Sequence, residues 1–353
     1  MTYEGPHWRI TPLHIFHSRR VLRLDPPTPL IGHIAIGIID RGTNIIQVRP
    51  STLCPHNCIY CSVDAGPGST TRQSELLADE SHLAAHATAV AEYKGVMVEH
   101  LIDGVGEPLT NPGILRLIAL LKKHPLTMRV ALETHGGFLT RRLIDRLAST
   151  GLDRINLSLD TLDPDKARLL SGAPWYDVGR VVKMIEHALD AGIDVVLTPV
   201  VVPGINEDDM TQLIELARSL ELGKQTGWPT GVLIQKYERH KYGRKPPGTR
   251  EWSWAKFYRW LHQLEERTGY PLRPSMEQLG IRPAPKLSTQ YRRGEKITLH
   301  AAAPGWHKGE TLAVTRRGDR LAALYCRHPC RPGRKVQAVI LRSRDNVIVA
   351  REI

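Results

Sequence analysis

The feature that most constrains the fold is a repeated alternation of short apolar runs with amphipathic segments. Strand-like runs occupy residues 44–49, 100–106, 128–134, 154–160, 194–202 and 231–237. Segments with helical periodicity follow them, at residues 81–95, 112–124, 139–149, 176–191, 206–221 and 251–268. Because parallel strands need crossover connections and helices supply them, this order predicts an α/β fold with a parallel sheet, either open or curled into a barrel. Polar and glycine residues gather at the carboxyl ends of the strands, where such folds place active sites.

Two further parts flank this region. Residues 33–49 read HIAIGIIDRGTNIIQVR, and two β-branched runs on either side of Asp40-Arg41-Gly42 predict a hairpin. The Pro-rich residues 281–285 predict a linker, after which come short β-type runs broken by turn residues. We therefore expect an N-terminal extension with a β-hairpin over residues 1–43, an α/β domain over 44–280 and a small C-terminal all-β barrel over 286–353.

Positive charge is concentrated in the last part of the chain. The formal net charge is +12, and residues 286–353 contain 15 Lys and Arg against 5 Asp and Glu. A basic domain on a nearly neutral body is typical of a protein that binds a polyanion, with nucleic acid as the first candidate. A merely solvated surface is the alternative. Because no apolar signal region and no run near the roughly 20 apolar residues of a membrane helix is visible, we expect a cytoplasmic protein without a membrane partner.

Three of the five cysteines lie within eight residues, in the stretch STLCPHNCIYCSVDAGPGS at residues 51–69. Structural zinc usually takes four ligands, and a redox Cys-x-x-Cys pair would leave Cys54 unexplained. A [4Fe–4S] cluster fits Cys54, Cys58 and Cys61 better, because thiolates hold such clusters and a compact loop can surround one. Three protein ligands would leave one iron open to a small chelating molecule.

With this cysteine motif directly after a strand, the chain resembles the radical S-adenosylmethionine (SAM) superfamily. The resemblance implies a partial (βα)6 TIM-like barrel, a [4Fe–4S] cluster on the three cysteines, and SAM bound to the open iron. It also implies that an electron from the cluster cleaves SAM to a 5′-deoxyadenosyl radical, with an electron donor such as ferredoxin or flavodoxin. Tyr60 matches the family's aromatic residue near the adenine.

The sequence Asp103-Gly104-Val105-Gly106-Glu107-Pro108 follows the second strand and resembles the family's Gly-Glu-Pro motif. The resemblance implies that Gly104, Gly106 and Glu107 bind the SAM ammonium group. Glycines permit close approach of the backbone, and a carboxylate pairs with a cation. A simple strand-to-helix turn is the alternative.

Polar residues also end the third and fourth strands. Thr134 closes the third, and period-two alternation places Asn156, Ser158 and Asp160 on one face of the fourth. The resemblance implies that these four residues contact the ribose and the methionine part of SAM. Turn and cap roles are the alternative.

Basic residues near the expected active site and in the C-terminal part are candidate contacts to phosphates. They are Lys236, Arg239, Arg292, Arg293, Arg316, Arg317, Arg334 and Lys335. Tyr291, Trp306 and Tyr325 are candidate stacking surfaces, although each is also a candidate core residue. The C-terminal part resembles, less sharply, a TRAM domain, a β-barrel that accompanies several RNA-modifying enzymes. Among them are radical SAM methylthiotransferases, but no cysteine precedes Cys54 here, which argues against their second cluster.

The remaining cysteines, Cys326 and Cys330, are possible accessory thiols. A methyl-carrier role, a disulfide, a weak metal site with His328 and inert thiols all stay open. The whole pattern predicts a radical SAM enzyme that modifies RNA, first of all transfer RNA, by carbon methylation or by radical rearrangement or lyase chemistry. Modification of a protein or peptide side chain, or of a small metabolite, is the alternative.

Overall fold

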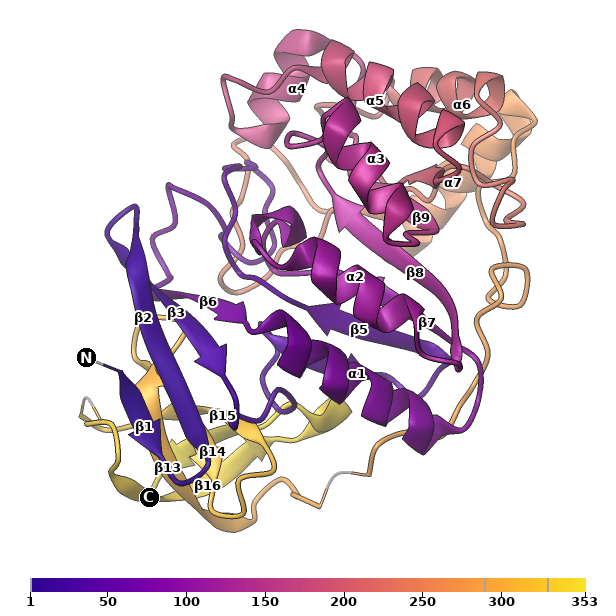
Figure 1. The fold of residues 1–353 in the computed structure, drawn as a ribbon. Coiled ribbons are helices and arrows are strands. Elements are labelled where there is room, and N and C mark those ends of the chain that lie inside the picture. Colours follow the sequence, from indigo (N-terminus) through magenta and orange to yellow (C-terminus); the bar gives the residue numbers. More distant parts are fainter. Residues whose placement is uncertain (1, 289, 329) are drawn as a thin grey trace. The chain divides into compact units, whose positions relative to one another are not determined.

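The computed structural model of the chain describes residues 2–288, 290–328 and 330–353, and its elements fall into two units. The first unit contains the chain up to Cys54, residues 69–128 and the residues from Pro283 onward. The second contains residues 55–68 and 129–282 (Figure 1).

The first unit begins with a four-stranded sheet that the sequence did not predict. Its strands, in spatial order, are β1 (Tyr3–Gly5), β2 (Trp8–Phe16), β3 (Arg19–Asp25) and β6 (Ser74–Ala78). The β2–β3 turn is formed by His17 and Ser18, with φ values of 42° and 68°. Two-residue turns with positive φ are usually marked by Asn or Gly, so the His-Ser pair carried no hairpin signal.

The predicted hairpin over residues 33–49 is confirmed. β4 (Gly37–Asp40) pairs antiparallel with β5 (Ile45–Arg49), and β5 pairs in parallel with β7 (Val98–Ile102). The helices of this part are α1 (Glu80–Lys94), η1 (Pro108–Thr110) and α2 (Ile114–Lys122). Because β5 and β7 are parallel, the loop that reaches Cys54 and the loop at residues 103–108 leave the same edge of the sheet.

The second unit repeats the strand–helix order. β8 (Thr127–Thr134) runs into it and pairs in parallel with β9 (Arg154–Leu157), which pairs in parallel with β10 (Asp194–Leu197). Its helices are α3 (Arg141–Ser149), α4 (Pro164–Ser171), α5 (Val178–Asp190), α6 (Met210–Ser219) and α7 (Trp254–Thr268). The α/β class is therefore confirmed.

Two details of the second unit differ from the prediction. The strand expected at residues 231–237 is reduced to β12 (Gln235–Lys236), which pairs with β11 (Val200–Val201), and to one bridge between Leu197 and Val232. The short helix α4 was missed, although Asp163 caps its first backbone N–H groups and a proline occupies its first turn.

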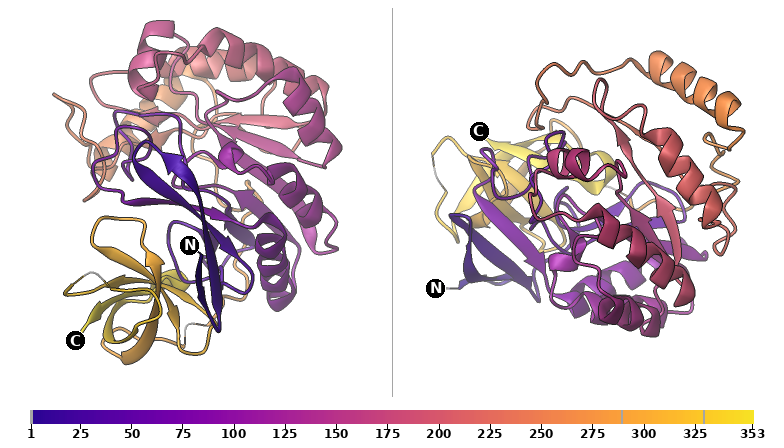
Figure 2. Two further views of the ribbon diagram at one scale, coloured as in Figure 1. Left: turned by 60° about the vertical axis from the view of Figure 1, so that its left-hand side comes forward. Right: turned by 90° about the horizontal axis from the view of Figure 1, so that it is seen from above.

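The predicted C-terminal β-barrel is confirmed. Five strands close in the order β13-β14-β15-β17-β16. Their bounds are β13 (Lys296–Pro304), β14 (Glu310–Thr315), β15 (Leu321–Tyr325), β16 (Lys335–Arg342) and β17 (Val349–Glu352), with η2 (Arg344–Asn346) before β17. Figures 1 and 2 show this barrel, in orange and yellow, beside the indigo N-terminal strands of the same unit, where the rings of Trp8 and His300 lie 5.6 Å apart.

The Pro-rich segment before the barrel is attached to the β4–β5 hairpin. Ala284 N donates a 3.0 Å hydrogen bond to the carbonyl of Gly42, and Lys94 Nζ donates one of 2.9 Å to the carbonyl of Pro285. Among the described residues, no helix combines the length and the apolar character needed to cross a membrane.

Candidate cofactor site

Cys54, the first predicted cluster ligand, is buried at the end of the loop after β5. Thr52 anchors this loop to β6, because its N–H donates to Leu76 O at 2.9 Å and its hydroxyl accepts from Leu76 N at 2.8 Å. The carbonyl of Leu53 accepts a 2.7 Å hydrogen bond from Glu107 N. The loop with the first cysteine is therefore bonded directly to the loop at residues 103–108.

The predicted SAM motif with Gly104, Gly106 and Glu107 lies in this second loop, directly after β7. A Cβ on Gly106 would lie 2.4 Å from the carbonyl oxygens of Thr52 and Leu53, so only glycine fits. Glu107 is buried, and its carboxylate accepts a 3.2 Å hydrogen bond from a backbone N–H of η1. Within the first unit, the structure thus brings Glu107 next to the loop that ends at Cys54.

Cys58 and Cys61 lie in the second unit, in the loop at residues 55–68. Cys61 N donates to the carbonyl of Cys58 at 3.2 Å, which folds this loop into a tight turn. A nitrogen atom lies within hydrogen-bond distance of each sulfur. Ala65 N donates to Cys61 Sγ at 3.2 Å, and His135 Nε2 lies 3.4 Å from Cys58 Sγ.

Arg244 supports this loop, a role that the sequence did not reveal. Its backbone N–H donates to Cys61 O at 2.8 Å, and its guanidinium donates to Cys58 O at 3.0 Å. The same guanidinium pairs with Asp64 at 2.9 Å and bonds the carbonyl of Ala65. Nothing local in the sequence shows that the partners of Arg244 lie some 180 residues earlier in the chain.

His135, which contacts the sulfur of Cys58, is stacked on a second histidine. The rings of His56 and His135 stack with centroids 4.6 Å apart and planes 22° apart. Burial lowers the pKa of His135 to about 4, and burial with the neighbouring His135 lowers that of His56 to about 2. Both rings are therefore neutral at pH 7. Because a cysteine thiolate only accepts hydrogen bonds, His135 faces it best with the proton on Nε2.

Tyr60 and Asp160, both predicted SAM contacts, are joined by a short hydrogen bond from the tyrosine hydroxyl to the carboxylate. Asp160 also accepts a 2.8 Å hydrogen bond from Val200 N. Burial raises the pKa of Asp160 to about 6, and burial together with Asp160 raises the pKa of Tyr60 well above its ordinary value. This hydrogen bond links the loop at residues 55–68 to the segment that directly follows β9.

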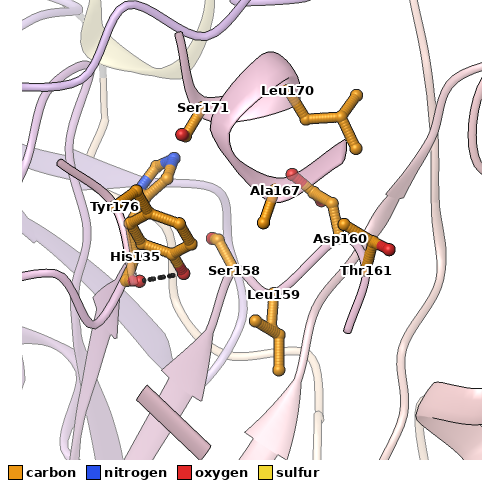
Figure 3. A pocket seen from close by; sticks show the side chains of 9 residues that line it. All are labelled: His135, Ser158, Leu159, Asp160, Thr161, Ala167, Leu170, Ser171 and Tyr176. Carbon is orange, nitrogen blue, oxygen red and sulfur yellow. Dashed lines mark hydrogen bonds between the residues drawn. The ribbon is translucent and has the colours of Figure 1, made fainter. Parts of the chain in front are cut away.

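Ser158 and Asp160 line one narrow cavity, shown in Figure 3, together with His135, Leu159, Thr161, Ala167, Leu170, Ser171 and Tyr176. The other two predicted contacts make local bonds. Thr134 Oγ1 accepts from Gly136 N at 3.0 Å, and Asn156 accepts from Arg154 Nε at 2.8 Å. Ser158 and Asp160 follow the end of β9 and line this cavity together with Leu159, whereas Asn156 is bonded along its own strand.

The predicted phosphate contacts divide into two groups. Lys236 is 3% exposed in its side chain, pairs with Glu251 at 2.6 Å and lies 5.0 Å from the ring of Trp254. Arg239 is exposed in the same region of the second unit. On the C-terminal barrel all six predicted cations are exposed: Arg292, Arg293, Arg316, Arg317, Arg334 and Lys335.

The structure decides between the alternatives that the sequence left open for the C-terminal aromatic and cysteine residues. Trp306 is 3% exposed, so of its two predicted alternatives the core role holds and the stacking surface does not; its indole packs inside the first unit. Tyr291 and Tyr325 are half-buried, and the Tyr291 hydroxyl donates to Asp319 at 2.7 Å. Cys326 and Cys330 form a disulfide, which is one of the predicted alternatives.

The residues of the cysteine loop fit a thiolate-bound cluster. Cys54, Cys58 and Cys61 are outside any disulfide, Ala65 N donates to the sulfur of Cys61, and His135 Nε2 lies within hydrogen-bond distance of the sulfur of Cys58. Hydrogen bonds to a charged group favour its charged form, and hydrogen bonds to cluster sulfurs tune reduction potential. The donor set is thus the one that an iron–sulfur cluster requires.

Comparisons with known proteins agree with this chemistry. The profile of the family described as "Radical SAM superfamily" matches residues 48–217. An uncharacterized protein of Methanocaldococcus jannaschii is 32% identical over 351 residues, covering 94% of this chain and 81% of that protein. A probable GTP 3′,8-cyclase of Pyrobaculum aerophilum is 31% identical over 214 residues, covering 56% of this chain and 66% of the cyclase.

A solved structure shows the same fold. The FeFe-hydrogenase maturase HydG from Carboxydothermus hydrogenoformans matches with a TM-score of 0.51 and 18% sequence identity, over 67% of this chain and 55% of the maturase. The chain therefore spans only part of the cyclase and of the maturase.

Proposed function

Because this chain belongs to the radical SAM superfamily, we propose that it is an enzyme of RNA modification, with transfer RNA as the first candidate substrate. Enzymes of this superfamily bind a [4Fe–4S] cluster and SAM, and they need a reductant. When bound, these groups supply the reductive cleavage of SAM. The chemistry on the RNA is then carbon methylation or a radical rearrangement or lyase reaction.

In this proposal Cys54, Cys58 and Cys61 would hold the cluster. Glu107 would bind the ammonium group of SAM, and Gly106 allows its loop to approach the loop that ends at Cys54. The remaining proposed SAM contacts are Tyr60, Gly104, Gly106, Thr134, Asn156, Ser158 and Asp160.

The exposed cations of the C-terminal barrel carry the RNA proposal. Lys335 stands opposite His300 on β13, and Arg316 N donates to the carbonyl of Thr298 on the same strand. Lys335 and Arg316 therefore flank β13 at neighbouring positions. Burial is the largest cause that lowers the pKa of His300. The nearby Lys335, His7 and Arg316 lower it further, which indicates a positive electrostatic potential at this strand. A TRAM-like role in RNA docking fits this basic face.

Salt dependence of RNA binding tests this face. Each phosphate neutralised by a protein cation contributes a slope of about 0.7–0.9 to the fall of log K with log salt. We expect the double variant Arg316→Ser/Lys335→Ser to reduce the slope for unmodified transfer RNA by about 1.5. The matched control is Arg141→Ser/Arg142→Ser, which removes two exposed arginines from α3. Equal slopes for the wild type and the first variant would exclude the β13 face from RNA binding.

Product analysis tests the reaction itself. Anaerobically reconstituted and reduced protein is incubated with SAM, with and without unmodified transfer RNA. We expect RNA to raise 5′-deoxyadenosine formation strongly and one nucleoside to change in mass or chromatographic position. A gain of one methyl group would indicate methylation, and a rearrangement would leave the mass unchanged.

A small nucleotide is the second candidate substrate, and the similarity to GTP 3′,8-cyclases favours it. In that case GTP without RNA would stimulate SAM cleavage, and mutation of the barrel cations would have no effect. Stimulation by a protein fraction alone would instead support modification of a protein side chain. Either result would overturn the RNA proposal and leave the cofactor assignment intact.

A further inference from the structure

Arg72 connects three parts of the first unit that the proposed function leaves unrelated. Its side chain is fully buried. One guanidinium nitrogen donates to the carbonyl of Thr52 at 2.7 Å, and the other donates to the carbonyl of Val105 at 2.5 Å. Thr52 lies two residues before Cys54, and Val105 lies between the two glycines of the SAM motif.

A carboxylate compensates the buried charge. Glu75 on β6 pairs with Arg72 at 3.0 Å, receives a second arginine, Arg19, at 3.0 Å, and accepts a 2.6 Å hydrogen bond from the hydroxyl of Thr52. Loss of one partner from a buried ion pair strongly destabilises the folded protein, because the other charge stays buried without compensation. These side chains therefore hold one another in place. The geometry of Arg72 is therefore fixed.

The C-terminal barrel covers the other face of the guanidinium. Trp306, in the β13–β14 connection, lies with its ring 4.8 Å from Arg72 Cζ. Backbone bonds fix this contact, because Gln73 N donates to Trp306 O and Lys308 N donates to Thr71 O, each at 2.9 Å. An aromatic face over a desolvated arginine is a favourable cation–π contact.

We propose that Arg72 is a positioning residue through which the C-terminal barrel fixes the two cofactor loops of the first unit. A planar guanidinium can donate in two directions at once, whereas a lysine ammonium lacks that fork. The barrel then has a second task, independent of RNA: its Trp306 keeps Arg72 on the carbonyls of Thr52 and Val105. This inference rests on the cofactor family and not on the RNA proposal.

The test compares Trp306→Phe with Trp306→Leu. Phenylalanine keeps an aromatic face over Arg72, and leucine keeps apolar bulk without one. In protein free of cofactors, we expect the leucine variant to speed hydrogen exchange at the amides of residues 52–54 and 105–107 by about tenfold and the phenylalanine variant by much less. In reconstituted protein, the leucine variant should raise the Kd for SAM by about 3–10-fold.

Arg72 itself is tested with Arg72→Lys and with Arg72→Met, which leaves Glu75 paired with Arg19. We expect the SAM affinity of the lysine variant to lie between that of the wild type and that of Arg72→Met. A matched control is Arg218→Met, since Arg218 also pairs with a carboxylate, that of Glu215, and lies over the ring of Tyr270.

Two results would overturn the proposal. One is faster exchange that is as large in α5 of the second unit as in residues 52–54 and 105–107, which would indicate general destabilisation. The other is unchanged exchange and SAM affinity in Trp306→Leu despite a lowered Tm. Neither result bears on whether RNA is the substrate.

Discussion

The Nε2 atom of His135 lies 3.4 Å from the sulfur of Cys58, a proposed cluster ligand. A donor to a cluster sulfur stabilises the more negative, reduced state, so it raises the reduction potential. We expect His135→Phe to lower the potential of the reconstituted cluster by on the order of 50 mV, equivalent to about 1 kcal/mol for one electron. A redox titration followed by electron paramagnetic resonance measures this shift.

His135→Gln provides the control for that experiment, because glutamine keeps an N–H donor on a side chain of similar reach. Its potential should stay near the wild-type value. Equal shifts in the two variants would show that the ring stacked on His56 matters through packing, and not through its hydrogen bond to sulfur.

His100 makes the stability of the first unit depend on pH. It is fully buried on β7, and burial, with a smaller contribution from His124, lowers its pKa from 6.5 to about 3. Between these values the unfolded chain binds a proton that the folded chain does not, so stability falls as the pH falls. We expect the free energy of unfolding to drop by roughly 1–2 kcal/mol from this residue between pH 7 and pH 5.

Urea unfolding at both pH values measures that drop, with His100→Leu as the test variant. Leucine cannot take up a proton, so its stability difference between pH 7 and pH 5 should be smaller than that of the wild type. His14→Asn, at an exposed histidine of β2, should keep the wild-type difference. The prediction fails if the stability of His100→Leu differs between pH 7 and pH 5 by as much as that of the wild type.

Lys94 holds the segment that leads into the barrel. Its ammonium donates to Asp40 at 2.7 Å and to the carbonyl of Pro285 at 2.9 Å, and both charged side chains are fully buried. We expect Lys94→Met to destabilise the protein by about 3–5 kcal/mol, because it leaves the Asp40 carboxylate buried without its cation. Denaturant midpoints at constant m-value measure the change.

The double variant Lys94→Met/Asp40→Asn removes both charges and should recover much of this loss. The exposed pair of Lys224 and Glu221 is the control, and Lys224→Met should cost less than about 1 kcal/mol. A Lys94→Met effect as small as that of Lys224→Met would contradict a structural role for the buried pair.

The sequence predicted those elements whose signals are local. The β4–β5 hairpin, the five-stranded barrel and six of the seven α-helices of the described residues follow from periodicity and turn residues within short windows. The cysteine spacing and the Gly106–Glu107 motif are local as well. The turn at His17 and Ser18 was missed because neither of its two positive-φ residues is Gly or Asn.

The supporting residues of the site could not be predicted, because their partners are distant in sequence. The role of Arg72 depends on its contact with Trp306, and the role of Arg244 depends on its hydrogen bond to Cys58. Neither contact is visible in the sequence. An arginine in a basic run looks the same in sequence whether it faces solvent or a buried carbonyl. For the same reason the sequence left Trp306 open as a stacking surface or a core residue, and the structure places it in the core.

Cys326 and Cys330 form a disulfide, and removing it tests whether these cysteines have a structural role or a chemical one. It closes a loop of only a few residues, so we expect full reduction to lower stability by at most about 2 kcal/mol. Thermal unfolding with and without reductant measures this, and Cys326→Ser/Cys330→Ser should show no response to reductant. In the product assay the same double variant should retain both 5′-deoxyadenosine formation and the modified nucleoside. If it still cleaved SAM but formed no modified nucleoside, a chemical role for one of the two sulfurs, such as carrying a methyl group, would replace the structural one.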